Sequence, residues 1–208
     1  PYVKEKYLIY GTAMHSAVEI FFKAKKTKQI GKEFLLETFE EGLEDVFLPD
    51  QEKTEMLERG KNSLSIWYEE RHNAWDKPYQ LEQALYGIEL EGIRLSGKLD
   101  KVEFVEEGGA EVIVTDYKTG KAKSRNDIEG KTKESNGNLK RQLIFYKLLL
   151  DLQGDYNMTR GIIEFLEPTD SGKIKYEEFE IDKKEVEELK ETVKRVADEI
   201  TTLKFWDI

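Results

Sequence analysis

The sequence contains no cysteine, and only two histidines, three methionines and four prolines among its 208 residues. Without cysteine, the chain cannot form a disulfide, a thiolate zinc site or a cysteine-ligated iron–sulfur cluster. It also has no apolar run long enough to cross a membrane and no pattern typical of a signal peptide. These absences favour a soluble cytoplasmic protein.

Charge is plentiful but unevenly distributed along the chain. Asp and Glu outnumber Lys and Arg by 43 to 33, and the resulting net charge of −10 at first disfavours a nucleic-acid partner. Residues 118–141, however, contain eight basic and three acidic residues, a local charge of +5 in a chain that carries −15 elsewhere. Such a basic strip attracts a phosphate backbone, although an ordinary solvated loop has a similar composition.

Hydrophobic periodicity predicts an α/β domain, with a central mixed sheet of four or five strands flanked by helices. The expected helices are 11–26, 31–47, 51–74, 138–152 and 183–203, and the expected strands are 79–90, 93–105, 111–117, 161–166 and 173–181. We interpret residues 1–208 as a single domain in which 31–74 form a helical insertion. Residues 119–137 show no pattern, and such long unpatterned segments are usually functional or disordered.

The most informative pattern is a predicted β-hairpin that carries two aspartates and a lysine. Its strands are GKLDKVEF, with Asp100, and VTDYK, with Asp116 and Lys118. A three-residue loop at 107–109 would place the aspartates directly opposite each other, with Cβ atoms about 4.5–5.5 Å apart and Lys118 on the same face. Two like charges so close are destabilising unless a cation lies between them. A divalent metal meets this need; the alternative is a solvated strand end with a Lys–Asp salt bridge.

Two helix faces carry further candidates. The segment GTAMH places His15 one turn before Glu19, and RQLIFY places Gln142 one turn before Tyr146. A lone histidine on an amphipathic helix is more often structural than a metal ligand, and an aromatic residue on a helix face more often belongs to the core. Each pair therefore gains functional meaning only in combination with the acidic hairpin.

Taken in order, GTAMH, GKLD, DYKTGK and QLIFY resemble the RecB-like branch of the PD-(D/E)XK nucleases over residues 10–146. The resemblance implies a restriction-endonuclease-like core and a metal-dependent DNA nuclease, acting on DNA ends or single strands in repair or recombination. Its implied metal ligands are His15, Asp100, Asp116 and the backbone carbonyl of Tyr117. Lys118 would be the catalytic lysine, and Gln142 and Tyr146 would support the site and the substrate strand.

Cofactor and DNA contacts follow from the same residues. Hard oxygen ligands suit Mg²⁺ or Mn²⁺, and an added imidazole favours Mn²⁺. We expect the basic strip to contact DNA phosphates through Lys121, Lys123, Arg125 and Lys131.

The chain also departs from the family pattern. Many relatives bind an iron–sulfur cluster through cysteines, so we expect either a relative without the cluster or a piece excised from a larger helicase–nuclease. A helicase is then a candidate partner, although the chain has no phosphate-binding GxxxxGK[ST] motif. The alternative functions are a DNA-binding module that does not cleave and a docking domain of a repair complex. The intact set of Asp100, Asp116 and Lys118 argues against the binding module.

Overall fold

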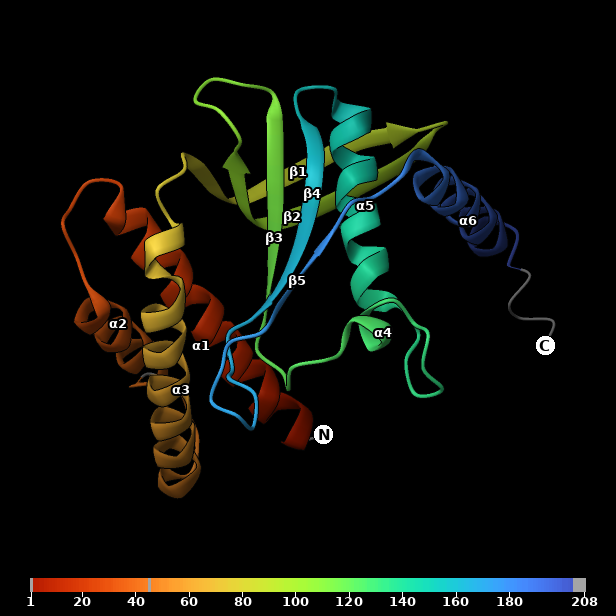
Figure 1. The fold of residues 1–208 in the computed structure, drawn as a ribbon. Coiled ribbons are helices and arrows are strands. Elements are labelled where there is room, and N and C mark those ends of the chain that lie inside the picture. The colour runs from red at the N-terminus through yellow and green to blue at the C-terminus, as the bar shows by residue number, and fades with distance from the viewer. Residues whose placement is uncertain (1, 45, 204–208) are drawn as a thin grey trace. The chain divides into compact units, whose positions relative to one another are not determined.

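The computed structural model of the protein describes residues 2–44 and 46–203 (Figure 1). The elements in chain order are α1 (Tyr2–Lys25), α2 (Lys32–Glu44), α3 (Asp50–Arg71), η1 (His72–Ala74), β1 (Tyr79–Leu90), β2 (Ile93–Phe104), β3 (Glu111–Lys118), α4 (Arg125–Ile128), α5 (Asn138–Gln153), β4 (Asn157–Phe165), β5 (Tyr176–Phe179) and α6 (Lys183–Thr201). The chain divides into two compact units, described separately below. Unit 1 comprises Pro1–Lys77, Tyr117–Lys123 and Ile163–Glu177, and unit 2 comprises Pro78–Asp116, Ser124–Ile162 and Glu178–Ile208.

The strands form one mixed sheet in the order β1-β2-β3-β4-β5. The pairs β1–β2 and β2–β3 are antiparallel. Strand β4 runs parallel to β3, because the N–H of Asn157 donates to Ala110 O near the start of both strands and the N–H of Leu166 donates to Lys118 O near their ends. A parallel pair needs a crossover connection, which here contains α4 and α5. The predicted mixed sheet with flanking helices is therefore confirmed.

In unit 2, helix α5 packs closely against the sheet, in contact with β1 and β2 (Figure 1). Two glycines allow this approach: a Cβ atom at Gly97 of β2 would lie 2.5 Å from Leu149 Cδ1, and one at Gly161 of β4 would lie 3.0 Å from Leu143 Cδ1. Helix α6 packs on α5 through an apolar cluster that includes Leu148. Contacts along the length of α5 thus determine which face of the helix lies against the sheet.

Two segments depart from a regular pattern for local reasons. Strand β1 alternates poorly because its pairing with β2 shifts between Leu85 and Ile88, at a bulge containing Gly87 with φ of 66°. The segment 119–137 contains the short helix α4, whose N-cap Ser124 forms a capping box with Asp127. A second capping box, of Asp182 with Glu185, begins α6.

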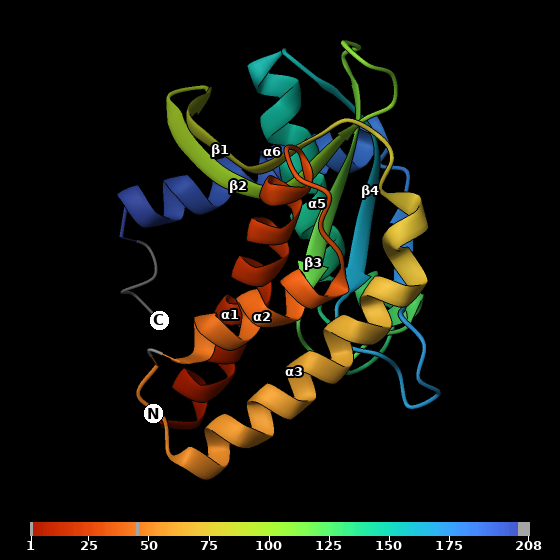
Figure 2. The same ribbon diagram turned by 90° about the vertical axis from the view of Figure 1, so that its left-hand side faces the viewer.

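In unit 1, helices α1, α2 and α3 pack on one another (Figure 2). Phe21 and Phe22 of α1 contact the rings of Trp67 and Trp75 edge-on. Tyr117, at the end of β3, also meets Trp67 edge-on, with ring centroids 5.9 Å apart. Within the described parts of the chain, α1 and α3 are the longest helices, and neither these nor any other helix is apolar enough to span a bilayer.

The contact between α2 and α3 generates a stability prediction. A Cβ atom at Gly60 of α3 would lie 2.1 Å from Cζ of the buried Phe39 ring, so Gly60→Ala forces these helices apart. We expect this overpacking to lower the free energy of unfolding by about 1–3 kcal/mol, despite the better helix propensity of alanine.

Gly42 of α2 provides the matched control, because nothing lies within 4 Å of a Cβ atom there. Gly42→Ala should stabilise the protein by about 0.5–1 kcal/mol through propensity alone. Urea denaturation of both variants measures the two effects, and equal stabilisation by both would show that the α2–α3 contact is looser than described.

Candidate active site

The acidic hairpin has the register that the sequence predicts. Across β2 and β3, Lys101 pairs with Thr115, Val102 with Val114 and Phe104 with Val112. Continued by one pair beyond Lys101 and Thr115, this register aligns Asp100 with Asp116. The connection is longer than the three residues expected, but the N–H of Val105 donates to Glu111 O, which keeps the same alignment. The valines on the aspartate face, at 102, 112 and 114, are fully buried.

Helix α5 brings a tyrosine to the two carboxylates. The hydroxyl of Tyr146 donates to Asp116 Oδ1 at 3.0 Å, and Gln142 Nε2 donates to the same hydroxyl at 2.7 Å. Burial raises the pKa of Tyr146 above its ordinary value, and the negative charges of Asp116 and Asp100 raise it further. The hydroxyl therefore remains a donor throughout the physiological pH range and lies close to both aspartates. Four candidates, Asp100, Asp116, Gln142 and Tyr146, are thus brought together in unit 2.

Lys118 follows Asp116 by two residues and belongs to unit 1, as do Tyr117 and His15. The backbone of Lys118 is tied to β4, because its carbonyl accepts the N–H of Leu166 at 2.8 Å. Helix α1 passes close to the next residue: a Cβ atom at Gly11 would lie 3.1 Å from Thr119 Oγ1. Gly11 of GTAMH thus adjoins the end of β3, and His15 lies one helical turn further along α1. The metal role of His15 remains a prediction.

The donor set fits a hard divalent cation. Asp116 is 2% exposed, and burying a carboxylate is unfavourable unless it is paired or hydrogen-bonded. Among residues 2–44 and 46–203, no three His, Asp or Glu side chains cluster closely enough to hold a metal by themselves. Mg²⁺ is usually bound through one or two carboxylates together with waters and substrate phosphates. Asp100 and Asp116 of unit 2 would supply that number of carboxylates.

The basic strip is partly compensated by its own acids. Lys131 Nζ lies 2.6 Å from Glu129 and lowers the pKa of that carboxyl. Arg125 lies over the ring of Phe179 and donates to Glu178 O. Lys121 and Lys123, in contrast, are exposed, and Lys121 lies 3.9 Å from the equally exposed Asp170. The strip is therefore not a uniform row of cations.

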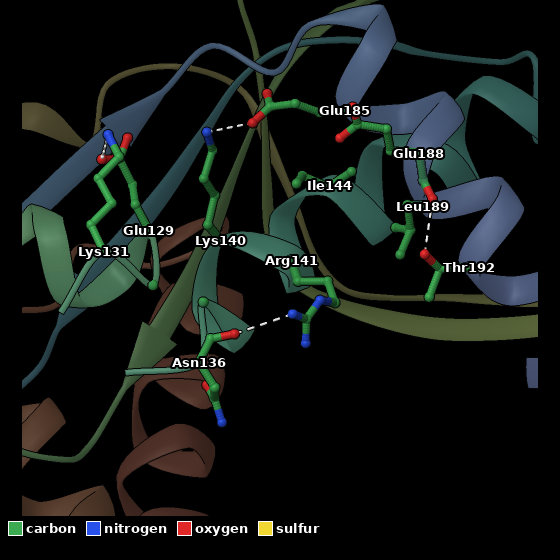
Figure 3. Close-up of a pocket in the computed structure, with 12 residues that line it drawn as sticks. Glu129, Lys131, Asn136, Lys140, Arg141, Ile144, Glu185, Glu188, Leu189 and Thr192 are labelled. Atoms are coloured by element: carbon green, nitrogen blue, oxygen red, sulfur yellow. Dashed lines mark hydrogen bonds and ion pairs between the residues drawn. The ribbon is translucent and has the colours of Figure 1, made fainter. Parts of the chain in front are cut away.

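A separate hollow of about 350 Å³ lies in unit 2, where the loop at 129–137 and the start of α5 face α6 (Figure 3). Lys140 reaches across it to Glu185, and Arg141 turns back to Asn136 O and Asn138. None of the acidic hairpin lines this hollow. Two ion pairs, Lys131 with Glu129 and Lys140 with Glu185, lie within its lining, and the second joins α5 to α6, which makes the hollow a structural junction.

Two buried acids escaped the sequence analysis. Glu164 of β4 is 4% exposed and accepts hydrogen bonds from Trp67 Nε1 and from Arg71 Nε and Nη2. Glu167, just beyond β4, pairs with Arg59. No local pattern marks either acid, because its partners lie about a hundred residues earlier in the chain. Glu164 is fully engaged in holding α3 to the end of β4 within unit 1.

Comparisons with known proteins identify the family. A comparison with curated proteins finds no match. A solved structure described as "Crystal structure of SSO0001" is similar over 92% of this chain and 74% of its own, with 17% identity and a TM-score of 0.39, too distant to bear on function. The family model of the PD-(D/E)XK nuclease superfamily matches residues 4–207. Members of this superfamily are generally nucleases that use divalent metals. Because this match spans nearly the whole sequence, the chain belongs to the PD-(D/E)XK nuclease superfamily.

Proposed function

We propose that this chain hydrolyses DNA phosphodiester bonds with Mg²⁺ or Mn²⁺ held by Asp100 and Asp116. The observation that supports this most directly is the hydroxyl of Tyr146, which is hydrogen-bonded to Asp116 and influenced by the charges of both aspartates. Two aspartates aligned on neighbouring strands repel each other, and a bound divalent cation would offset that repulsion. His15 and the backbone carbonyl of Tyr117 are the further ligands in this proposal.

The residues around the metal have separate tasks. A bound divalent ion would lower the pKa of a coordinated water and polarise a phosphoryl oxygen. Lys118 would offset the negative charge that develops on the phosphate as water attacks. Its backbone is held by the hydrogen bond to Leu166, so the flexibility that remains lies in the side chain. Gln142 and Tyr146 hold the Asp116 carboxylate in a fixed orientation.

The finer assignment follows the motif order. We infer a RecB-like nuclease that acts on DNA ends or single strands in repair or recombination, with a helicase domain or subunit as its partner. The helical residues 31–74 are, in this proposal, an insertion within a single nuclease domain. This assignment implies a protein that acts on DNA in the cytoplasm.

The central test compares Asp116→Asn and Lys118→Met with the wild-type protein on labelled single- and double-stranded DNA. Both variants should lose cleavage by a factor of about a hundred or more, the first through loss of metal and the second through loss of transition-state stabilisation. Single-turnover rates in Mn²⁺ provide the measurement.

Lys184→Met serves as the matched control, since Lys184 is an exposed lysine on α6 and its removal should leave cleavage unchanged. Retarded bands without metal-dependent products from the wild-type protein would indicate a binding module instead. Undiminished cleavage by Lys118→Met would place the catalytic cation elsewhere.

The hydrogen bond from Tyr146 generates a second prediction. Tyr146→Phe removes the donor to Asp116 but keeps the buried ring, so it should weaken Mn²⁺ binding by about tenfold or more. The melting temperature as a function of Mn²⁺ concentration reports this affinity by mass action.

Tyr156→Phe is the control, because the Tyr156 hydroxyl contacts Gln80 rather than the acids. Its metal dependence should match that of the wild type. If the melting temperature of Tyr146→Phe shows the same Mn²⁺ dependence as that of the wild type, the phenol does not hold Asp116 in place for the metal.

A third prediction concerns the basic strip. Replacing Lys121, Lys123 and Lys131 with Ala should weaken single-stranded DNA binding without sequence preference. Each lost phosphate contact should flatten the slope of log K against log salt by roughly 0.7 for single strands. Lys131→Ala alone should flatten it less than Lys123→Ala, because Lys131 is already paired with Glu129. An unchanged slope in the triple variant would identify the strip as a solvated connector.

A further inference from the structure

An arginine in unit 1 is held at the surface by two contacts. Arg59 of α3 donates from Nη2 to Glu167 Oε2 at 2.7 Å, and its guanidinium lies 5.0 Å from the ring centroid of Tyr10. Glu167 is 7% exposed and Tyr10 is 3% exposed, whereas half of the Arg59 side chain faces solvent. The guanidinium is therefore fixed from the protein side and open on the other.

The position of Arg59 connects it with the end of β3. Glu167 directly follows Leu166, whose N–H is bonded to the carbonyl of Lys118. Tyr10 directly precedes Gly11, which adjoins Thr119. Glu167 and Tyr10, which hold Arg59, are thus sequence neighbours of two residues that adjoin the end of β3. All of these residues belong to unit 1.

The charge of Arg59 is secure. Its hydrogen bond to Glu167 raises the pKa of the guanidinium further above its ordinary value. Burial, followed by the charge of Glu167, raises the pKa of Tyr10, so that ring remains a neutral phenol beneath the cation. A planar, permanently charged fork suits a phosphate group, which accepts paired N–H donors.

We propose that Arg59 binds a backbone phosphate of a single-stranded DNA next to the scissile position, and that Glu167 and Tyr10 are its positioning residues. The identity of this substrate rests on the proposed nuclease function. Tyr7, one turn before Tyr10 on α1, adds a base-stacking surface, because its side chain is 62% exposed. An arginine beside an exposed aromatic ring is typical of single-strand binding sites.

A purely structural role for the Arg59–Glu167 pair makes a different prediction. Arg59→Gln alone leaves the buried Glu167 carboxylate without its cation and could lower stability for that reason. The double variant Arg59→Gln/Glu167→Gln removes both charges and restores the balance. Under a structural role, the double variant recovers both stability and DNA binding; under our proposal, it recovers stability alone.

The experiment measures binding of a fluorescent oligo-dT by anisotropy in EDTA, over a range of salt, with thermal melting in parallel. The double variant should melt near the wild-type temperature, bind on the order of tenfold more weakly and show a salt slope flatter by about 0.7. The matched control is Lys61→Gln/Glu40→Gln, which neutralises another ion pair of α3, formed at 2.6 Å. It should leave affinity and slope unchanged.

Stacking on Tyr7 is tested with a second probe. Tyr7→Ala should weaken binding of oligo-dT roughly five- to a hundredfold but leave binding of an abasic oligomer of the same length unchanged. The proposal is overturned if Arg59→Gln/Glu167→Gln binds like the wild type, or if the wild type does not bind oligo-dT in EDTA. Wild-type binding that depends on Arg59, without any cleavage in Mn²⁺, would support this inference while refuting the nuclease function.

Discussion

The repulsion between two carboxylates at one end of a β-hairpin is the constraint on which the rest of the site depends. Asp116 is almost wholly buried, and the register of β2 and β3, continued by one pair beyond Lys101 and Thr115, aligns it with Asp100. A buried carboxylate is unfavourable unless hydrogen bonds or an opposite charge compensate it. Helix α5 supplies the donor through Tyr146, with Gln142 behind it. The cation is what the proposed function adds.

Local features explain why the hairpin could be predicted from the sequence. Its register depends on local features, namely the double glycine at 108–109 and the alternation of valines on either side. The loop was longer than expected, yet the alignment held, because the ladder continues through Val105 and Glu111. Gln142 and Tyr146 were also predictable as a pair, since a spacing of four residues places two side chains on one helix face.

Other features depend on contacts between residues far apart in the chain, and no sequence pattern reveals them. The bulge at Gly87 breaks the alternation of β1. The ion pair of Arg59 with Glu167 joins residues 108 positions apart. Glu164 resembles any surface glutamate in the sequence, but three donors from Trp67 and Arg71 surround it in the structure. The capping box of α4 was visible in principle, as serine followed three residues later by aspartate, but the surrounding lysines and glycines obscured it.

Gly97, one of the two glycines beneath α5, links the sheet to the geometry of the proposed metal site. Gly97 lies on β2 three residues before Asp100, and Leu149, which fills the space above it, lies one helical turn beyond Tyr146. A side chain at position 97 would force Leu149 to shift, and a bulky one would also displace α5 and carry the phenol away from Asp116. A random mutagenesis screen for lost activity would therefore recover substitutions of Gly97 that reach the proposed metal site through the helix, although residue 97 itself binds neither metal nor DNA in our proposal. The distance between α5 and the sheet thus determines the position of the Tyr146 hydroxyl relative to Asp116. Natural variation in the volume of residue 149 could therefore change metal affinity while every proposed ligand stays the same.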